Sequence, residues 1–192
     1  MRRLAFALVL FAAAAASAQT LSEGEVLRGR FVQDRHLAGF AQPVRSMGSF
    51  VLVPGRGLIW RAESPFPVVT VVTPAGLVQS VDGTETTRLP AARLPFMSRL
   101  YAMMAGAMAG DWRALEAEFT VTRQAGRITL TPVRPGDATA IQSIGAVVGR
   151  FVDEVDIVRP GGDFDHLVFT GQSLTAGPPG ADEATALDGA AR

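Results

Sequence analysis

Apolar and polar positions alternate in short runs along most of this chain, and turn residues separate the runs. Alternation with a period of two is typical of strands in a sheet. Strands that follow one another at this spacing indicate an antiparallel meander. The predicted strands cover residues 31–37, 45–53, 58–61, 68–73, 77–81, 84–89, 119–123, 127–133, 151–158 and 164–170, and residues 139–148 are expected to be a loop or one helical turn followed by a strand.

The predicted strand at 45–53 is apolar on both of its faces. Val51 shares one face with Val53 and Met47, whereas Phe50 and Leu52 share the other. A strand with one face in water would instead place polar residues on that side. Both faces therefore need a cover, which can be a helix on one side and a ligand on the other.

A helical pattern replaces the alternation at residues 96–110. Pro95 suits the start of a helix and Gly110 suits its end. Methionine is flexible and suits exchangeable apolar contacts, so two interpretations stay open: an ordinary core helix over the sheet, or a lid over an apolar ligand cavity. The apolar stripe of this helix consists of Met97, Leu100, Met104 and Met108.

Two shorter helices and a tail complete the predicted elements. Residues 21–28 are expected to form a helix, because Ser22 and Glu25 have the spacing of a capping box. A second short helix is expected at 111–117. Residues 173–192 are rich in Gly, Pro, Ala and Asp with few apolar anchors, so we expect a disordered tail there.

The first 18 residues have the features of a cleavable signal peptide. They begin with two arginines, continue with a short apolar run and end in the small residues Ala16, Ser17 and Ala18. We expect cleavage before Gln19 and export to the periplasm; an uncleaved anchor is the alternative, but the run is short for a membrane span. This prediction leaves one domain, at residues 19–172, before the tail.

Composition removes several classes of function. The chain has no cysteine, which excludes disulfides, thiol chemistry and cysteine-bound metals. Lys and Arg balance Asp and Glu at 18 each, so there is no basic surplus to indicate nucleic-acid binding. Phosphate-loop and dinucleotide fingerprints are also missing, and no cofactor is predicted.

No catalytic arrangement emerges from the motifs. His36 and His166 are the only histidines, and nothing resembles the Gly-x-Ser-x-Gly turn of serine hydrolases. Asp163, Asp165 and His166 can be written as half a metal site, but they lie at a turn, where aspartate is common. We therefore predict neither catalytic residues nor a metal site.

A series of motifs lies in the first half of the chain in the order Phe31-x-Gln33, Gly48-x-Phe50, a Pro-Gly turn, Leu58-Ile59-Trp60 and Pro65. In this order it resembles the LolA-like outer-membrane lipoprotein carriers, over roughly residues 25–170. The resemblance implies an α+β fold, an incomplete and curved antiparallel β-barrel (half-barrel) with a helical lid. In well-studied carriers an Arg before the Pro that follows the second strand ties the lid shut. Val53 precedes Pro54 here, so this latch is missing, as in a divergent branch of the family.

The resemblance implies a periplasmic carrier and chaperone for lipoprotein acyl chains or another lipidic cargo. Burial of an acyl chain is worth about 0.8 kcal/mol per CH₂ group. The implied partners are the cargo, an inner-membrane donor and an outer-membrane acceptor, and we expect a monomer without a cofactor. Two alternatives are a hydrolase of lipid intermediates that uses Ser, Asp or His36, and an envelope scaffold with a filled core. The predicted cavity residues are Phe50, Leu52, Trp60, Val69, Val71, Phe96, Met97, Leu100 and Met104.

Overall fold

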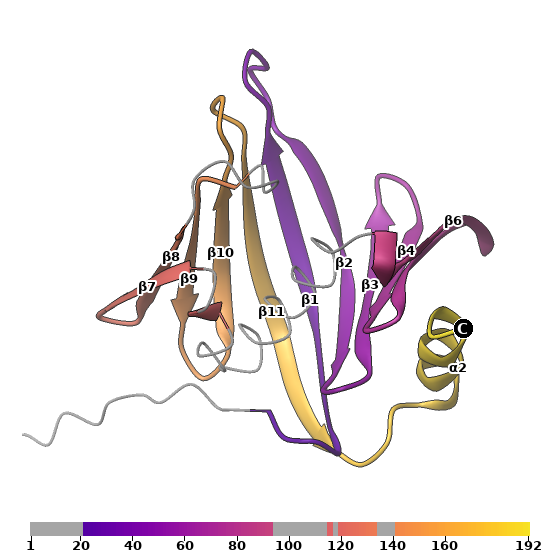
Figure 1. Ribbon diagram of the computed structural model, residues 1–192. Helices are drawn as coiled ribbons and strands as arrows, with labels where there is room; N and C mark the ends of the chain where they lie inside the picture. Colours follow the sequence, from indigo (N-terminus) through magenta and orange to yellow (C-terminus); the bar gives the residue numbers. More distant parts are fainter. Residues whose placement is uncertain (1–20, 94–114, 117–118, 134–140) are drawn as a thin grey trace, which may run out of the picture.

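A computed structural model of the chain describes residues 21–93, 115–116, 119–133 and 141–192. Its main element is one antiparallel sheet of eleven strands, shown in Figure 1. A 3₁₀ turn, η1 (Ala91–Arg93), follows β6, and the helix α2 (Ala181–Ala190) ends the chain. The strands are β1 (Glu25–His36), β2 (Val44–Val53), β3 (Gly57–Ser64), β4 (Val68–Thr73), β5 (Gly76–Val81), β6 (Thr84–Pro90), β7 (Phe119–Gln124), β8 (Arg127–Pro132), β9 (Ser143–Val148), β10 (Val152–Val158) and β11 (Phe164–Ala176).

The sheet is open, and its order is β6-β5-β4-β3-β2-β1-β11-β10-β9-β8-β7. Strands that follow one another along the chain are neighbours, as the meander pattern predicted. The strands β6 and β7 are the exception. At the centre of the sheet the first strand pairs with the last, and Glu25 lies opposite Ala176. Strands β6 and β7 form the two edges without pairing with each other. The predicted incomplete antiparallel barrel is therefore confirmed.

Cross-strand pairing sorts the side chains onto two faces. Leu27 lies opposite Leu52, which in turn lies opposite Leu58. Val51 lies opposite Ile59 in the alternate register positions. Residues directly opposite each other share a face of the sheet, so the leucines lie on one face and Val51 and Ile59 on the other. Each face carries its own apolar cluster.

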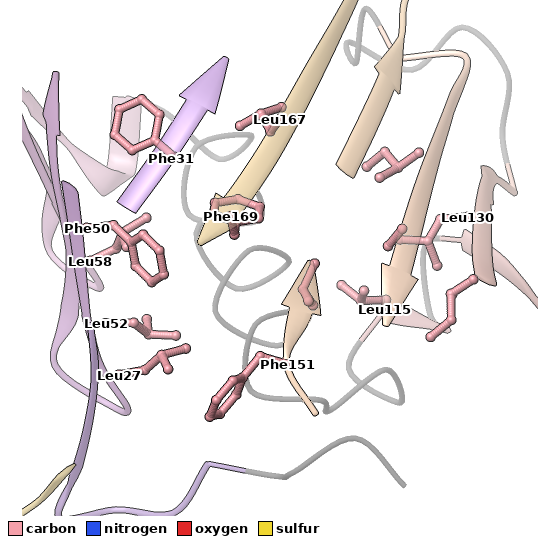
Figure 2. Packing of buried hydrophobic residues seen from close by; sticks show 14 of the residues in the cluster. Leu27, Phe31, Phe50, Leu52, Leu58, Leu115, Leu130, Phe151, Leu167 and Phe169 are labelled. Carbon is pink, nitrogen blue, oxygen red and sulfur yellow. The ribbon is translucent and has the colours of Figure 1, made fainter. Parts of the chain in front are cut away.

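We call the larger cluster the inner cluster and its side of the sheet the inner face. It extends from β3 across the centre of the sheet to β7, and Figure 2 shows side chains of β1, β2 and β3 lying across from Leu115 and Leu130. The buried members of the inner cluster are Leu21, Leu27, Phe31, Phe50, Leu52, Leu58, Leu115, Phe119, Ile128, Leu130, Ile141, Ile144, Ala146, Phe151, Val152, Leu167 and Phe169.

The outer cluster lies on the opposite face, beneath α2. The helix packs on β3, β4 and β5 and buries Leu187 and Ala190 against the sheet. Helix α2 thus provides a cover for the second apolar face of β2, as the pattern of that strand required. The sheet residues of the outer cluster are Val26, Val51, Val53, Ile59, Val71 and Val78.

The predicted disordered tail at 173–192 is wrong. Strand β11 continues to Ala176, and the following helix begins after Gly180, whose N–H donates to Glu183. Glu183 also accepts two hydrogen bonds from Arg28, at 2.8 and 2.6 Å, which fixes the start of α2 to β1. The prediction relied on the low apolar content of this segment. A helix that docks on an apolar sheet face can do so with a narrow apolar stripe, which here consists of Leu187 and Ala190.

The predicted helix at 21–28 is also wrong, because β1 begins at Glu25. The pair that suggested a capping box does interact, and Ser22 N–H donates to the Glu25 carboxylate at 2.7 Å. The Glu25 N–H returns a bond to the Ser22 carbonyl, so the contact closes a turn around Gly24, which has a φ of 83°. Pairing with two neighbouring strands then extends the chain.

Several predictions concern residues outside the described ranges. These are the signal peptide at 1–18, the helix at 96–110 and all but two residues of the helix at 111–117. The strand expected at the end of 139–148 is present as β9. Within the described ranges, no helix has both the length and the apolar character needed to cross a membrane.

Candidate functional site

Four aromatic rings form the centre of the inner face. Phe31 stacks on Trp60 with ring centroids 3.7 Å apart, and Phe169 meets Phe50 edge to face at 5.5 Å. The rings come from β1, β2, β3 and β11, which the sheet order makes neighbours although β11 is distant in sequence. Cross-strand register explains the grouping, since Phe31 lies opposite Phe169 and Phe50 opposite Trp60. The result is one packed aromatic cluster, in which Trp60 is partly exposed and the three phenylalanine rings are buried.

Gly29 on β1 makes room for this surface. A Cβ atom at Gly29 would lie 2.6 Å from the ring of Phe50 and 3.2 Å from the side chain of Gln172. Real Cβ atoms do not approach other atoms as closely as the first distance. Any larger residue at Gly29 would therefore move the Phe50 ring out of its place on the inner face.

Partly exposed apolar side chains surround the buried inner cluster. They include Trp60 and residues on both halves of the sheet, so the apolar surface continues beyond the fully buried centre. Exposed hydrocarbon on a sheet face gains free energy when another apolar group covers it. The partly buried residues that pack on the inner cluster are Trp60, Ala62, Val121, Val148, Val155, Ile157 and Leu174.

One buried polar atom interrupts this apolar face. The Gln172 Nε2 group donates to the Val152 carbonyl at 2.8 Å, which sets the orientation of the amide. The Gln172 Oε1 atom is buried, and no hydrogen-bond partner for it is found among the described residues. A buried acceptor without a partner is costly.

The inner face becomes polar at the end where β1 finishes. Asp165 is only 1% exposed there and accepts hydrogen bonds from Arg35 Nε at 2.7 Å and Gln33 Nε2 at 3.1 Å. Arg159 forms a second ion pair with the same carboxylate. Burial acts to raise the pKa of Asp165, but hydrogen bonds from the two arginines outweigh it and hold the pKa below its ordinary value. We call Gln33, Arg35, Arg159 and Asp165 the polar end.

The structure brings together three of the predicted cavity residues. Phe50 and Leu52 are fully buried in the inner cluster, and Trp60 packs on it half-buried. Val69 and Val71 belong to the outer cluster instead, so their prediction as lining of the same cavity is wrong. The remaining predicted residues, Phe96, Met97, Leu100 and Met104, lie outside the described ranges.

Register explains the misplacement of the two valines. Trp60 lies opposite Thr70, so Thr70 shares the inner face and its two neighbours in β4 point to the outer side. Strand β4 has valines on both of its faces, so its sequence gives no sign of which face is inner. Phe169 and the polar end were not among the predicted site residues, although alternation along β1 places Gln33 and Arg35 on the face of Phe31.

Asp163, Asp165 and His166, which in the sequence resemble half a metal site, do not come together in the structure. Asp165 lies on the inner face. His166, the next residue in β11, lies on the other face, where its Nδ1 atom is 2.7 Å from the carboxylate of Asp156 on β10. The Asp163 carboxylate accepts the N–H of Ala38 at 2.7 Å. Among the described residues, no group of three or more His, Asp or Glu side chains is arranged to hold a metal ion.

Comparison with known proteins gives no match to a protein-family model and none to a curated protein. Among solved structures, the chain is similar to a LolA superfamily protein from Nitrosomonas europaea, at 7% identity and a TM-score of 0.41, over 88% of this chain and 92% of that one. It is also similar to an outer membrane lipoprotein-sorting protein domain from Vibrio parahaemolyticus, at 9% identity and a TM-score of 0.38, over 88% and 93% of the two chains.

A third similar structure is the Pseudomonas aeruginosa MucA/MucB complex, at 15% identity and a TM-score of 0.40, over 83% of this chain and 54% of that one. The similarity concerns the fold alone at these identities. The function is therefore argued from the chain's own residues.

Proposed function

We propose that this protein is a periplasmic carrier that binds acyl chains of lipoproteins, or of another lipidic cargo, on its inner face and passes them toward the outer membrane. The observation that carries the proposal is the set of partly buried apolar side chains, Trp60, Val155 and Ile157 among them, that surrounds the inner cluster on one face of an open sheet. Such a surface can shield hydrocarbon from water without any chemical step.

The energetics suit reversible binding. Each methylene group moved from water to the inner face contributes about 0.8 kcal/mol, so a long acyl chain supplies enough free energy to offset the cost of association. Transfer then needs only an acceptor with a better apolar site. The inner-membrane donor and the outer-membrane acceptor are part of this proposal, as are export through a signal peptide and the absence of enzymatic turnover.

A matched pair of valines tests the assignment of the inner face. Val155 on β10 packs on the inner cluster, whereas Val168 on β11 lies in the alternate position, opposite Glu154. We expect Val155→Asn to weaken binding of a fluorescent acyl probe about tenfold, which corresponds to a loss of about 1.4 kcal/mol. Val168→Asn should leave that affinity unchanged.

The same preparation separates a carrier from the two alternatives. Mass spectrometry of lipids that co-purify from the periplasm should find acylated cargo at a fixed molar ratio to the protein, and this cargo should be recovered unchanged after incubation. Turnover of the lipid would instead favour the hydrolase. Failure of wild-type protein to bind any acyl probe would favour the scaffold and refute the proposal.

A further inference from the structure

The apolar inner face and the polar end lie along the same strands. On β1 and β11 the pair Phe31–Phe169 is followed, four residues further along β1, by the pair Arg35–Asp165. At the rise of a strand this separates the two pairs by about 13 Å. Ile157 lies opposite Asp165 and packs on the inner cluster. The ion pair therefore lies on the same face of the sheet as the apolar side chains and directly beside them.

The polar end carries one net positive charge. The guanidinium groups of Arg35 and Arg159 share the single carboxylate of Asp165. Because Asp165 is buried and also bound by Gln33, its position is fixed, and it holds both arginines in place. The other acidic group nearby, Asp163 in the loop before β11, is bound by the N–H of Ala38.

Arg35 has hydrogen-bonding capacity left over. It reaches Asp165 through Nε alone, at 2.7 Å, and its side chain is 49% exposed. No described residue accepts a hydrogen bond from its two terminal nitrogens. These nitrogens form part of a planar fork that matches the oxygens of a phosphate or a carboxylate. An arginine oriented in this way beside an apolar surface has the donors needed for a charged head group.

We propose that the inner face selects amphiphiles whose apolar tail ends in an oxyanion, a phosphate or a carboxylate, and that Arg35 binds this anion. The tail lies on the partly buried apolar side chains that surround the aromatic centre, Trp60 and Ile157 among them, and the anion meets the terminal nitrogens of Arg35. This inference rests on the proposed acyl-carrier function and narrows its cargo to anionic lipids. Asp165 positions Arg35 and does not itself contact the cargo.

Three ligands of equal chain length test the assignment: dodecyl phosphate, dodecanoate and the neutral dodecanol, each measured by calorimetry below its micelle concentration. Wild-type protein should bind both anions more tightly than dodecanol. Arg35→Gln should weaken binding of both anions about tenfold, because a hydrogen bond to a charged group is worth roughly that factor. The variant should bind dodecanol as the wild type does, and Arg35→Lys should retain part of the preference for anions.

Arg45→Gln is the matched control. Arg45 also pairs with an aspartate, Asp34, near the same end of β1, but alternation places it on the other face. Its loss removes the same charge from the molecule, so an effect of general electrostatics would appear equally in both variants. We expect Arg45→Gln to leave all three affinities unchanged.

The outcomes distinguish this inference from the function on which it rests. If no ligand binds, the carrier proposal itself fails. If dodecanol binds but Arg35→Gln changes all three affinities equally, or none, only the anion site is refuted. Inorganic phosphate separates a lipid head group from a free anion: tight binding of inorganic phosphate that Arg35→Gln abolishes would show that the site takes a free anion and would overturn the assignment to amphiphiles.

Discussion

Leu187 is the residue on which the docking of α2 depends most. It is the largest side chain that the helix buries, with 1% exposure, and it lies against the valines and Ile59 of the outer cluster. A helix of ten residues is only marginally stable alone in water. The helix therefore persists because it is docked, and the perturbation that tests this is Leu187→Ala.

The expected loss can be worked out from the burial of that side chain. Replacing a fully buried leucine by alanine costs about 3 kcal/mol, from lost transfer free energy and the cavity left behind. This loss of stability cannot exceed the free energy with which α2 docks on the sheet, because a helix that has already left the sheet loses nothing further. We therefore expect Leu187→Ala and the harsher Leu187→Asp to destabilise by similar amounts if undocking is the result.

Two measurements separate undocking from global unfolding. Urea denaturation followed by the fluorescence of Trp60, in a Trp112→Phe background that leaves it as the single tryptophan, reports on the sheet, since that ring packs on the inner cluster. Hydrogen exchange reports on residues 181–190 directly, and they should lose protection in Leu187→Ala before the strands do. Thr185→Ala is the control, because Thr185 is exposed and bonds only to Ala181 within the helix.

Two results would refute this reasoning. In one, Leu187→Ala keeps the free energy of unfolding within about 0.5 kcal/mol of the wild type, the range expected for an ordinary surface change. In the other, residues 181–190 of the wild type already exchange as fast as an unfolded chain. The second result would restore the disordered tail that the composition indicated.

Three further predictions concern single positions. Gly48→Ala should destabilise by about 3 kcal/mol or more in chemical denaturation, because the new Cβ would lie 1.8 Å from the backbone carbonyl of Arg61, whereas Gly189→Ala, in open space on α2, should stabilise slightly. Asp165 has a lowered pKa in the folded state, so its stabilisation is complete above its ordinary pKa of 3.8 and is lost as the pH falls through the lower folded value; Asp165→Asn should flatten the acid side of a stability-against-pH curve, and an unchanged slope would contradict the ion-pair assignment. N-terminal sequencing of the periplasmic fraction should find Gln19 first, and an intact Met1 on cytoplasmic protein would contradict export.

Most strands could be predicted because their signals are local. The strand at 68–73 matches β4 at both ends, and the predicted Pro-Gly turn separates β2 from β3 at residues 54–56. Pairing of β1 with β11 had no local signal, since the register that joins Glu25 to Ala176 is set by tertiary contacts. The fold class was therefore predicted correctly, whereas the pairing of the strands at the centre of the sheet was not predicted.

The candidate site was predicted only in part for a related reason. Phe50, Leu52 and Trp60 were found because aromatic and aliphatic residues in a strand must pack somewhere. Which face they share depends on how neighbouring strands align, and this misplaced Val69 and Val71. From the sequence Asp165 resembled an ordinary turn residue, because its two arginines lie elsewhere in the chain, Arg35 on β1 and Arg159 just after β10.

The meeting of the two chain ends at the centre of the sheet has a consequence for synthesis and truncation. In a sheet whose last strand lies at an edge, a shortened chain merely frays. Here a chain without β11 separates into two half-sheets, β1–β6 and β7–β10, and exposes the unpaired backbone of β1 and β10. Contacts this distant in sequence also form slowly. During synthesis the chain is therefore most prone to aggregation in the interval before β11 has been made and has paired with β1 and β10.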